Sequence, residues 1–178
     1  MTDKTLRYSI VLFDWGDTVM RDNPAETVPM VEWQTVEAVA GIADVLAYLH
    51  SSGRRIGLAT SADVSEESQI RGALRRCGLD RYFSHIYSFK NTQLPKGEAF
   101  YRHILNDLSI PASEVLMVGD HFEKDIRAAN AAGLFAVWFN PRSEETRTGD
   151  LHMTVHSMQE LLEIFTSLDK SFLAVKSS

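Results

Sequence analysis

The stretch from Ile10 to Thr18 reads Ile-Val-Leu-Phe-Asp-Trp-Gly-Asp-Thr and places a carboxylate directly after a continuous apolar run. Consecutive apolar residues without polar alternation are typical of a strand that is covered on both faces. Asp14 is therefore expected at the carboxyl end of a buried strand, where an unpaired charge costs several kcal/mol. That cost indicates that the carboxylate has a partner or a chemical role.

Short apolar runs of the same kind recur along the chain and alternate with helical patterns. The predicted strands are Tyr8–Phe13, Arg55–Ala59, His85–Phe89, Val115–Val118 and Leu134–Phe139, and Val155 is a candidate for a sixth short strand. Repeated strand–helix units favour right-handed crossovers. The pattern predicts an α/β fold: a doubly wound, Rossmann-like and mostly parallel sheet flanked by helices.

Apolar residues at helical spacing predict the helices between these strands. The stripes run over Ile42–Leu49, Ile70–Cys77, Tyr101–Leu108 and Met158–Phe165, and a shorter helix is expected from about residue 123 to 132. The second helix is expected to open at Asp63, with Glu66 completing a capping box, and to close at Gly78. Residues 170–178 are expected to fray.

Length and composition indicate one domain over residues 1–178, since 44% hydrophobic and 24% charged residues are ordinary values for a globular protein. The net charge of −6 argues against a nucleic-acid footprint. Cys77, the single cysteine, is interpreted as a structural thiol. No window is apolar enough for a membrane span and the first residues contain no apolar signal core, so we expect a cytoplasmic protein that does not bind membranes.

Three carboxylates are expected to meet at one edge of the sheet. Asp14 and Asp120 each follow a buried strand, and Asp125 lies in the first turn of the next helix. Ligands of doubly wound sheets bind beyond the carboxyl ends of the strands, where the strand order reverses. Two carboxylates about 4 Å apart repel by roughly 4 kcal/mol at an effective dielectric constant near 20. A cation is therefore expected, and oxygen ligands alone favour Mg²⁺ over Zn²⁺.

Four motifs in order resemble those of the haloacid dehalogenase superfamily. They are Asp14-x-x-x-Thr18, then Thr60 after a second strand, Lys96 before a helix, and Gly119-Asp120-x-x-x-x-Asp125. Short strings containing aspartate recur by chance, but four in this order are a specific signal. The resemblance spans roughly Tyr8 to Asn140, about three quarters of the chain.

The resemblance implies a Mg²⁺-dependent phosphatase in which Asp14 is the nucleophile and forms an aspartyl-phosphate. The backbone carbonyl of Gly16 and the carboxylates of Asp14, Asp120 and Asp125 would hold the metal. Lys96 would offset the negative charge around Asp14.

The phosphoryl group would be bound by a second set of residues in the same resemblance. Thr60, the adjacent Ser61 and nearby backbone N–H groups would donate to its oxygens, and Lys96 would contribute its charge.

One position departs from the family pattern. Most phosphatases of this family carry a second aspartate two residues after the nucleophile, where this chain has Gly16. Asp17, displaced by one residue, is either a catalytic substitute or a residue that caps the turn. General acid–base catalysis contributes typically 10² to 10⁴-fold. We therefore expect slow turnover, or restriction to good leaving groups such as acyl or aryl phosphates.

The site is expected to lack a sizeable cap domain. Members of this family insert caps after the first motif or between the second and third, and neither interval here has room for one. The segment of about residues 19–40 is the only intrinsic flap. Expected substrates are a phosphorylated small molecule or an exposed phosphoester on a larger one, and a second copy of the chain is a candidate for completing the open site.

Two other functions remain open from the sequence. A metal-independent dehalogenase would use the same aspartate on carbon, but the retained Asp120 and Asp125 count against it. A binding module that kept the metal and phosphoryl site and lost turnover at Gly16 is the third hypothesis.

Overall fold

A computed structural model describes residues 8–176 of the chain, with side chains through residue 171. Six strands form one sheet in the order β3-β2-β1-β4-β5-β6, and all neighbouring pairs are parallel. The strands are β1 (Ile10–Phe13), β2 (Arg55–Ala59), β3 (His85–Tyr87), β4 (Val115–Gly119), β5 (Phe135–Phe139) and β6 (His152–Val155). The predicted doubly wound α/β fold is confirmed, with the order reversing between β1 and β4.

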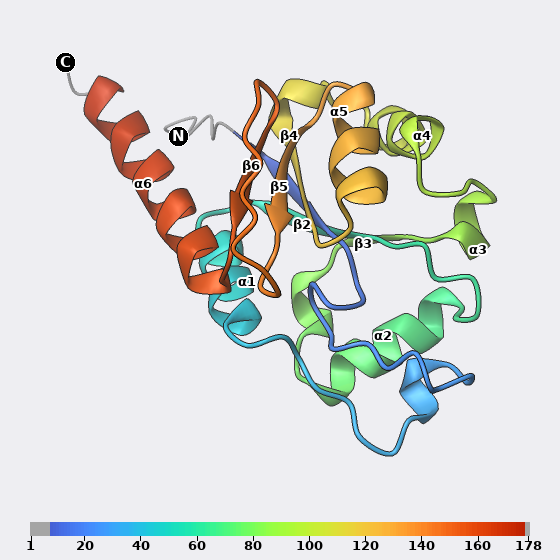
Figure 1. The fold of residues 1–178 in the computed structure, drawn as a ribbon. Coiled ribbons are helices and arrows are strands. Elements are labelled where there is room, and N and C mark those ends of the chain that lie inside the picture. The colour runs from blue at the N-terminus through green and yellow to red at the C-terminus, as the bar shows by residue number, and fades with distance from the viewer. Residues whose placement is uncertain (1–7, 177–178) are drawn as a thin grey trace.

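Helices cover both faces of this sheet (Figure 1). One face packs against α1 (Ile42–Ser51), α2 (Glu67–Arg76) and α6 (Met158–Lys176), and the other against α4 (Glu98–Leu108) and α5 (Ala128–Ala131). A further short helix is α3 (Phe89–Thr92), and single 3₁₀ turns lie at Met30–Glu32, Asp80–Tyr82 and Ala112–Glu114. The two layers explain the apolar strands, since neither face meets water.

Strand β1 shows how the sequence fills two cores at once. Val11 and Phe13 belong to the cluster under α1 and α6, while Ile10 and Leu12 belong to the cluster under α4 and α5. All of them are at most 1% exposed. Successive side chains of a strand point to opposite faces, so an apolar residue is required at every position.

Several element boundaries differ from the sequence prediction. Strand β3 ends at Tyr87, because Ser88 caps α3 and its backbone N–H donates to Asn91 Oδ1 at 2.9 Å. Helix α2 is capped by Glu66, whose backbone N–H donates to Gln69 Oε1 at 2.8 Å, so Asp63 lies outside the helix. Both differences have the same cause. At the start of each helix, a side chain accepts a hydrogen bond from the backbone N–H of the capping residue and so fixes where the first turn begins.

The helix expected over residues 123–132 consists of two parts. A π-helical turn spans Phe122–Arg127, and α5 follows it. Such turns are rare and occur frequently at functional sites.

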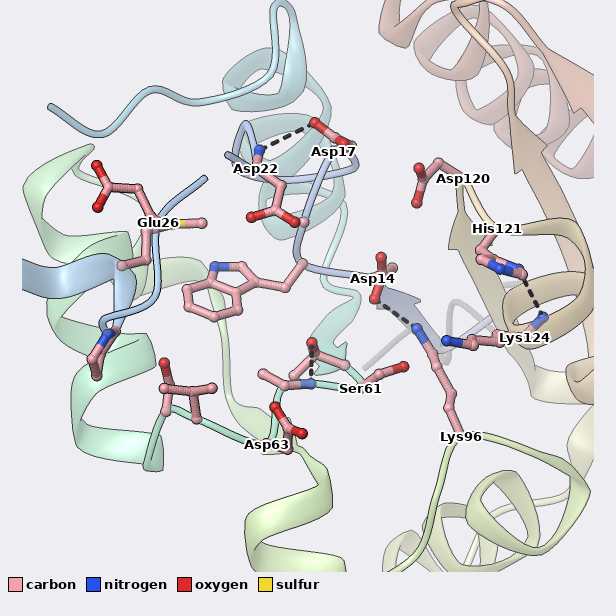
Figure 2. Close-up of a pocket in the computed structure, with 18 of the residues that line it drawn as sticks. Asp14, Asp17, Asp22, Glu26, Ser61, Asp63, Lys96, Asp120, His121 and Lys124 are labelled. Atoms are coloured by element: carbon pink, nitrogen blue, oxygen red, sulfur yellow. Dashed lines mark hydrogen bonds and ion pairs between the residues drawn. The ribbon is translucent and has the colours of Figure 1, made fainter. Parts of the chain in front are cut away.

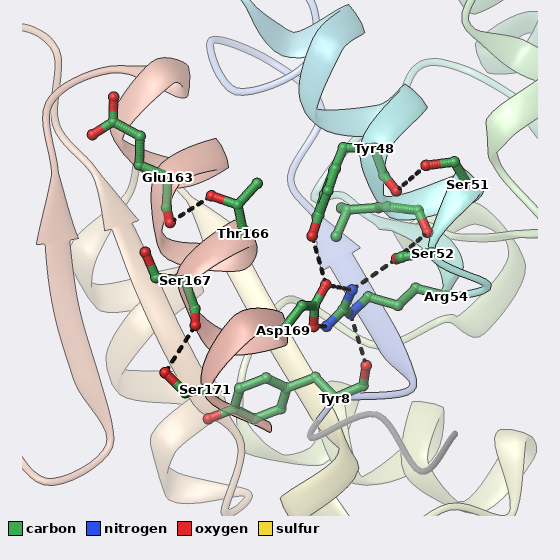
Figure 3. Close-up of polar contacts among 11 residues, drawn as sticks. Tyr8, Tyr48, Ser51, Ser52, Arg54, Glu163, Thr166, Ser167, Asp169 and Ser171 are labelled. Carbon is green, nitrogen blue, oxygen red and sulfur yellow. Dashed lines mark hydrogen bonds and ion pairs between the residues drawn. The ribbon is translucent and has the colours of Figure 1, made fainter. Parts of the chain in front are cut away.

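Helix α6 runs through Lys176, beyond residue 170, from which fraying was expected; residues 177–178 lie outside the described part of the chain. Its anchor is Arg54, whose guanidinium is fully buried and pairs with Asp169 at 2.5 Å (Figure 3). Arg54 Nε also donates to the carbonyl of Tyr8 at 3.1 Å, and the Tyr48 hydroxyl donates to Asp169 at 2.7 Å. Burial and this hydrogen bond raise the pKa of Tyr48 to about 12, so the hydroxyl keeps its proton. The anchor lies at the amino ends of β1 and β2.

Within residues 8–176, no helix is both long enough and apolar enough to cross a bilayer.

Candidate active site

The carboxyl ends of β1 and β4 bring Asp14 and Asp120 together. Phe13 pairs with Val118 in the sheet, and the backbone N–H of Asp14 donates to the carbonyl of Val118 at 2.9 Å. One carboxylate oxygen from each of Asp14, Asp120 and Asp125 lies within 4.8 Å of the others. The structure therefore brings these carboxylates together on the wall of one cavity, in which Figure 2 labels Asp14 and Asp120.

Asp125 reaches this point because the π-helical turn folds its side chain back against the end of β4. Its Oδ2 accepts from the backbone N–H of His121 at 2.9 Å, and its own N–H donates to the His121 carbonyl at 2.8 Å. A Cβ placed on Gly119 would lie 2.3 Å from Asp125 Oδ2. Glycine at position 119 is thus required by the close approach of the carboxylate.

Lys96 forms ion pairs with two of these carboxylates. Its side chain is 2% exposed, and Nζ lies 2.6 Å from Asp14 Oδ1 and 2.5 Å from Asp125 Oδ1. Burial alone would lower the pKa of Lys96, but Asp14 and then Asp125 outweigh it and raise the pKa. The ammonium group therefore stays charged, and it compensates only part of the cluster.

Asp120 is the carboxylate of this cluster that lies outside the ion pairs of Lys96. Its backbone carbonyl accepts from Trp138 Nε1 at 2.9 Å, which fixes the loop after β4. Burial, followed by the carboxylates of Asp14 and Asp125, raises the pKa of Asp120 to about 7. A divalent cation among these oxygens would remove the repulsion, and an all-oxygen donor set suits Mg²⁺. The residues present therefore fit the metal that the sequence predicted.

We expect Asp120→Asn to stabilise the metal-free protein as the pH rises. The raised pKa means that the folded state resists ionisation of Asp120, so wild-type stability falls from about pH 4 to about pH 7. Asparagine avoids this loss, and after allowance for solvent screening Tm in EDTA should rise by about 2–6 °C at pH 8. Differential scanning fluorimetry at several pH values measures this change.

Mg²⁺ provides the control for the same experiment. It should raise Tm of the wild type more than that of the variant, because the variant lacks one ligand charge. A gain from Asp120→Asn that is the same at pH 4 and pH 8 would contradict the assignment.

The loop after β2 supplies the predicted phosphate-binding residues. Thr60 is 4% exposed, and its Oγ1 accepts from the backbone N–H of Ala62 at 3.1 Å. Ser61 is exposed and lines the cavity with Thr60 and Lys96. Thr60 thus shapes the loop as well as lining the cavity.

Asp17 is engaged by other groups. It has a positive φ of 55°, its Oδ1 accepts from the backbone N–H of Asp22 at 3.1 Å, and its Oδ2 pairs with Arg142. These contacts favour the turn-holding interpretation of Asp17 over the catalytic one. The sequence gave no indication of Arg142 as its partner.

The segment of residues 19–40 packs on α2 and forms one wall of the cavity, which has a volume of about 400 Å³. Arg76 donates to the carbonyls of Val31 at 3.1 Å, Trp33 at 2.6 Å and Gln34 at 3.0 Å. A Cβ on Gly72 of α2 would lie 2.7 Å from Val31 Cγ2. Through these hydrogen bonds Arg76 ties the flap to the fold.

Removing the Arg76 side chain is expected to loosen the flap. Three carbonyls lose their donor in Arg76→Ala, so opening should become easier by about 1–2 kcal/mol, or about 5–30-fold in equilibrium constant. Hydrogen exchange of residues 28–34 measures the change. Arg75→Ala is the matched control, because its side chain is 67% exposed and pairs with Asp80 instead. Equal exchange in both variants would refute the anchoring role.

Comparison with known proteins agrees with this fold. The family model for haloacid dehalogenase-like hydrolases matches residues 17–139, more than half of the chain. The chain belongs to this family of hydrolases. The matched span begins after Asp14 and Gly16, so the assignment of these two residues depends on the geometry above.

Among curated relatives, the pyrimidine 5'-nucleotidase PynA of Streptococcus pneumoniae is 33% identical over 105 residues, covering 57% of this chain and 43% of that protein. The glyceraldehyde 3-phosphate phosphatase of Methanocaldococcus jannaschii is 26% identical over 128 residues, covering 70% and 55%. The chain thus spans about half the length of these relatives. An uncharacterised protein from Listeria monocytogenes has the same fold, with a TM-score of 0.77 at 23% identity, covering 91% of this chain and 99% of that one.

Proposed function

We propose that the protein is a Mg²⁺-dependent phosphohydrolase that acts through an aspartyl-phosphate on Asp14. The observation that carries this proposal is the convergence of three carboxylates, those of Asp14, Asp120 and Asp125, within 4.8 Å. The buried Lys96 pairs with two of them. The names of the relatives, a nucleotidase and a phosphatase, support phosphoester hydrolysis as the reaction class.

In the first step Asp14 attacks phosphorus, and Lys96 and the metal compensate negative charge. An oxygen of Asp14 forms a bond to phosphorus while the bond from phosphorus to the leaving oxygen breaks, and the electron pair goes to that oxygen. Lys96, held at 2.6 Å from Asp14, offsets the charge of the incoming phosphoryl group. Mg²⁺ held by Asp14, Asp120, Asp125 and the Gly16 carbonyl would polarise the phosphoryl group.

The second step restores Asp14. A water oxygen attacks phosphorus, the bond from phosphorus to the Asp14 oxygen breaks, and phosphate leaves. Backbone N–H groups and hydroxyls of the Thr60–Ser61 loop would orient the phosphoryl oxygens through both steps.

The substrate is proposed to be a phosphorylated small molecule, since the cavity of about 400 Å³ has the size of a small-ligand pocket. Its wall is the flap rather than a cap domain, so an exposed phosphoester on a larger molecule could also reach Asp14. Gly16 brings no proton donor of its own, and this turn by itself favours acyl and aryl phosphates.

A panel of phosphate esters assayed for inorganic phosphate, with Mg²⁺ and with EDTA, tests the proposal. Release of phosphate that depends on Mg²⁺ is expected, and beryllofluoride should form a Mg²⁺-dependent adduct on Asp14. An adduct without turnover of any ester would favour the binding module instead. Turnover of 2-haloacids in EDTA would favour the dehalogenase.

A further inference from the structure

We propose that Asp22 is the proton donor to the leaving oxygen, in the place that Gly16 leaves without a side chain. The inference rests on the proposed phosphohydrolase function and adds a catalytic residue to it. It also changes the expected substrate range, because a site with a proton donor is not confined to good leaving groups.

The position of the Asp22 carboxyl group is the main observation. A Cβ built on Gly16 would lie 3.4 Å from Asp22 Cβ, 3.5 Å from Cγ and 3.5 Å from Oδ2, and these are the three heavy atoms nearest to it. The carboxyl group of Asp22 thus occupies the space beside Gly16 into which a side chain at that position would extend. Asp22 and Asp14 line the same cavity (Figure 2).

The turn after Asp14 directs Asp22 to this place. Asp17 adopts a positive φ, and its N–H donates to the carbonyl of Met20 at 2.6 Å, which folds the chain back. The Asp17 carboxylate then accepts from the Asp22 N–H at 3.1 Å and is itself paired with Arg142. In this arrangement Asp17 positions the residue that performs the chemistry.

The two carboxyl oxygens of Asp22 have different surroundings. Oδ1 accepts from the backbone N–H of Asn23 at 2.9 Å. Oδ2 is the oxygen that lies beside Gly16, and Asp22 is one of the residues that line the cavity. One oxygen therefore accepts from the backbone, while the other, beside Gly16, is the one that we assign to proton transfer.

The chemical step is balanced for both halves of the reaction. When the bond from phosphorus to an alkyl oxygen breaks, that oxygen receives the electron pair from the bond and the proton from Asp22, and an alcohol leaves. In the second half, the Asp22 carboxylate takes a proton from the water whose oxygen attacks phosphorus. Asp22 ends protonated, as it began.

The test compares an alkyl phosphate with an aryl phosphate in Asp22→Asn. An alkoxide is a poor leaving group and an aryl oxide is a good one, so loss of the donor should affect the two substrates unequally. We expect kcat for the alkyl ester to fall about 100-fold or more, and kcat for p-nitrophenyl phosphate to fall less than about 3-fold. Glu26→Gln, a charge-matched change in the same cavity wall, should leave the ratio of the two rates unchanged.

A second variant keeps the result interpretable. Gly16 does not adopt a positive φ, so Gly16→Asp is compatible with the backbone. Because an asparagine at position 22 would still fill the space beside Gly16, the rescue is tested in Asp22→Ala, where Gly16→Asp should restore at least about 10-fold of the lost alkyl phosphate turnover. Equal loss of both substrates in Asp22→Asn, or no rescue by Gly16→Asp, would overturn the assignment of Asp22 and leave the phosphohydrolase proposal standing. A wild-type protein that hydrolyses neither ester would overturn both.

Discussion

Replacing Asp14 by Asn is expected to abolish phosphate release, with kcat/KM lowered by about 10⁴-fold or more. An amide of the same shape keeps the packing at the end of β1 but is a far weaker nucleophile than a carboxylate. The variant should remain folded, because Lys96 keeps its ion pair with Asp125 and the repulsion among the carboxylates decreases. Phosphate release from the best substrate of the panel measures the loss.

A charge-matched control is available in α1. Asp44 is exposed in the first turn of that helix, and Asp44→Asn should leave kcat/KM unchanged. If Asp14→Asn retains more than about a tenth of the wild-type activity, Asp14 is not the nucleophile.

Replacing Lys96 by Met is expected to destabilise the fold by about 3–5 kcal/mol at neutral pH. The substitution conserves much of the aliphatic volume but leaves Asp14 and Asp125 without the ammonium group 2.5–2.6 Å away. Uncompensated buried charges are costly, and Tm should fall by about 10 °C or more. Chemical denaturation and calorimetry both measure this change.

Mg²⁺ should recover part of that loss, since a divalent cation supplies the charge that lysine no longer provides. Lys124→Met is the control, because Lys124 lines the same cavity but is exposed. We expect it to change stability by less than about 0.5 kcal/mol. Equal destabilisation by both substitutions would show that the ion pairs of Lys96 contribute little.

The convergence of Asp14 and Asp120 could be predicted from the sequence because two local rules are sufficient for it. Uninterrupted apolar runs identify strands buried on both faces, and parallel strands end at a common edge. Asp125 was expected at the same edge from its place in the first turn of the next helix, whereas Lys96 was located by motif order. Their close contact with each other was not readable, since it depends on the π-helical turn after β4.

There is a physical reason why the roles of Asp22, Arg76 and Arg142 could not be predicted from the sequence. Each depends on contacts across loops, in which no periodicity relates the partners. Arg76 binds carbonyls 42–45 residues earlier, and Arg142 pairs with a carboxylate 125 residues away. The start of α2 illustrates a related difficulty, since Asp63 and Glu66 both satisfy a capping pattern and only the fold selects one.

The pair of Arg54 and Asp169 stands at the far end of the sheet from Asp14. Repulsion among the carboxylates at the ends of β1 and β4 lowers the free energy of unfolding. The ion pair that attaches α6 at the other end of the sheet offsets part of this loss. Weakening the attachment would lower the number of folded molecules in a cell without altering what each folded molecule does. Variants of Arg54 should therefore be less abundant in the cell than the wild type, whereas variants of Asp14 should be as abundant but catalytically inactive.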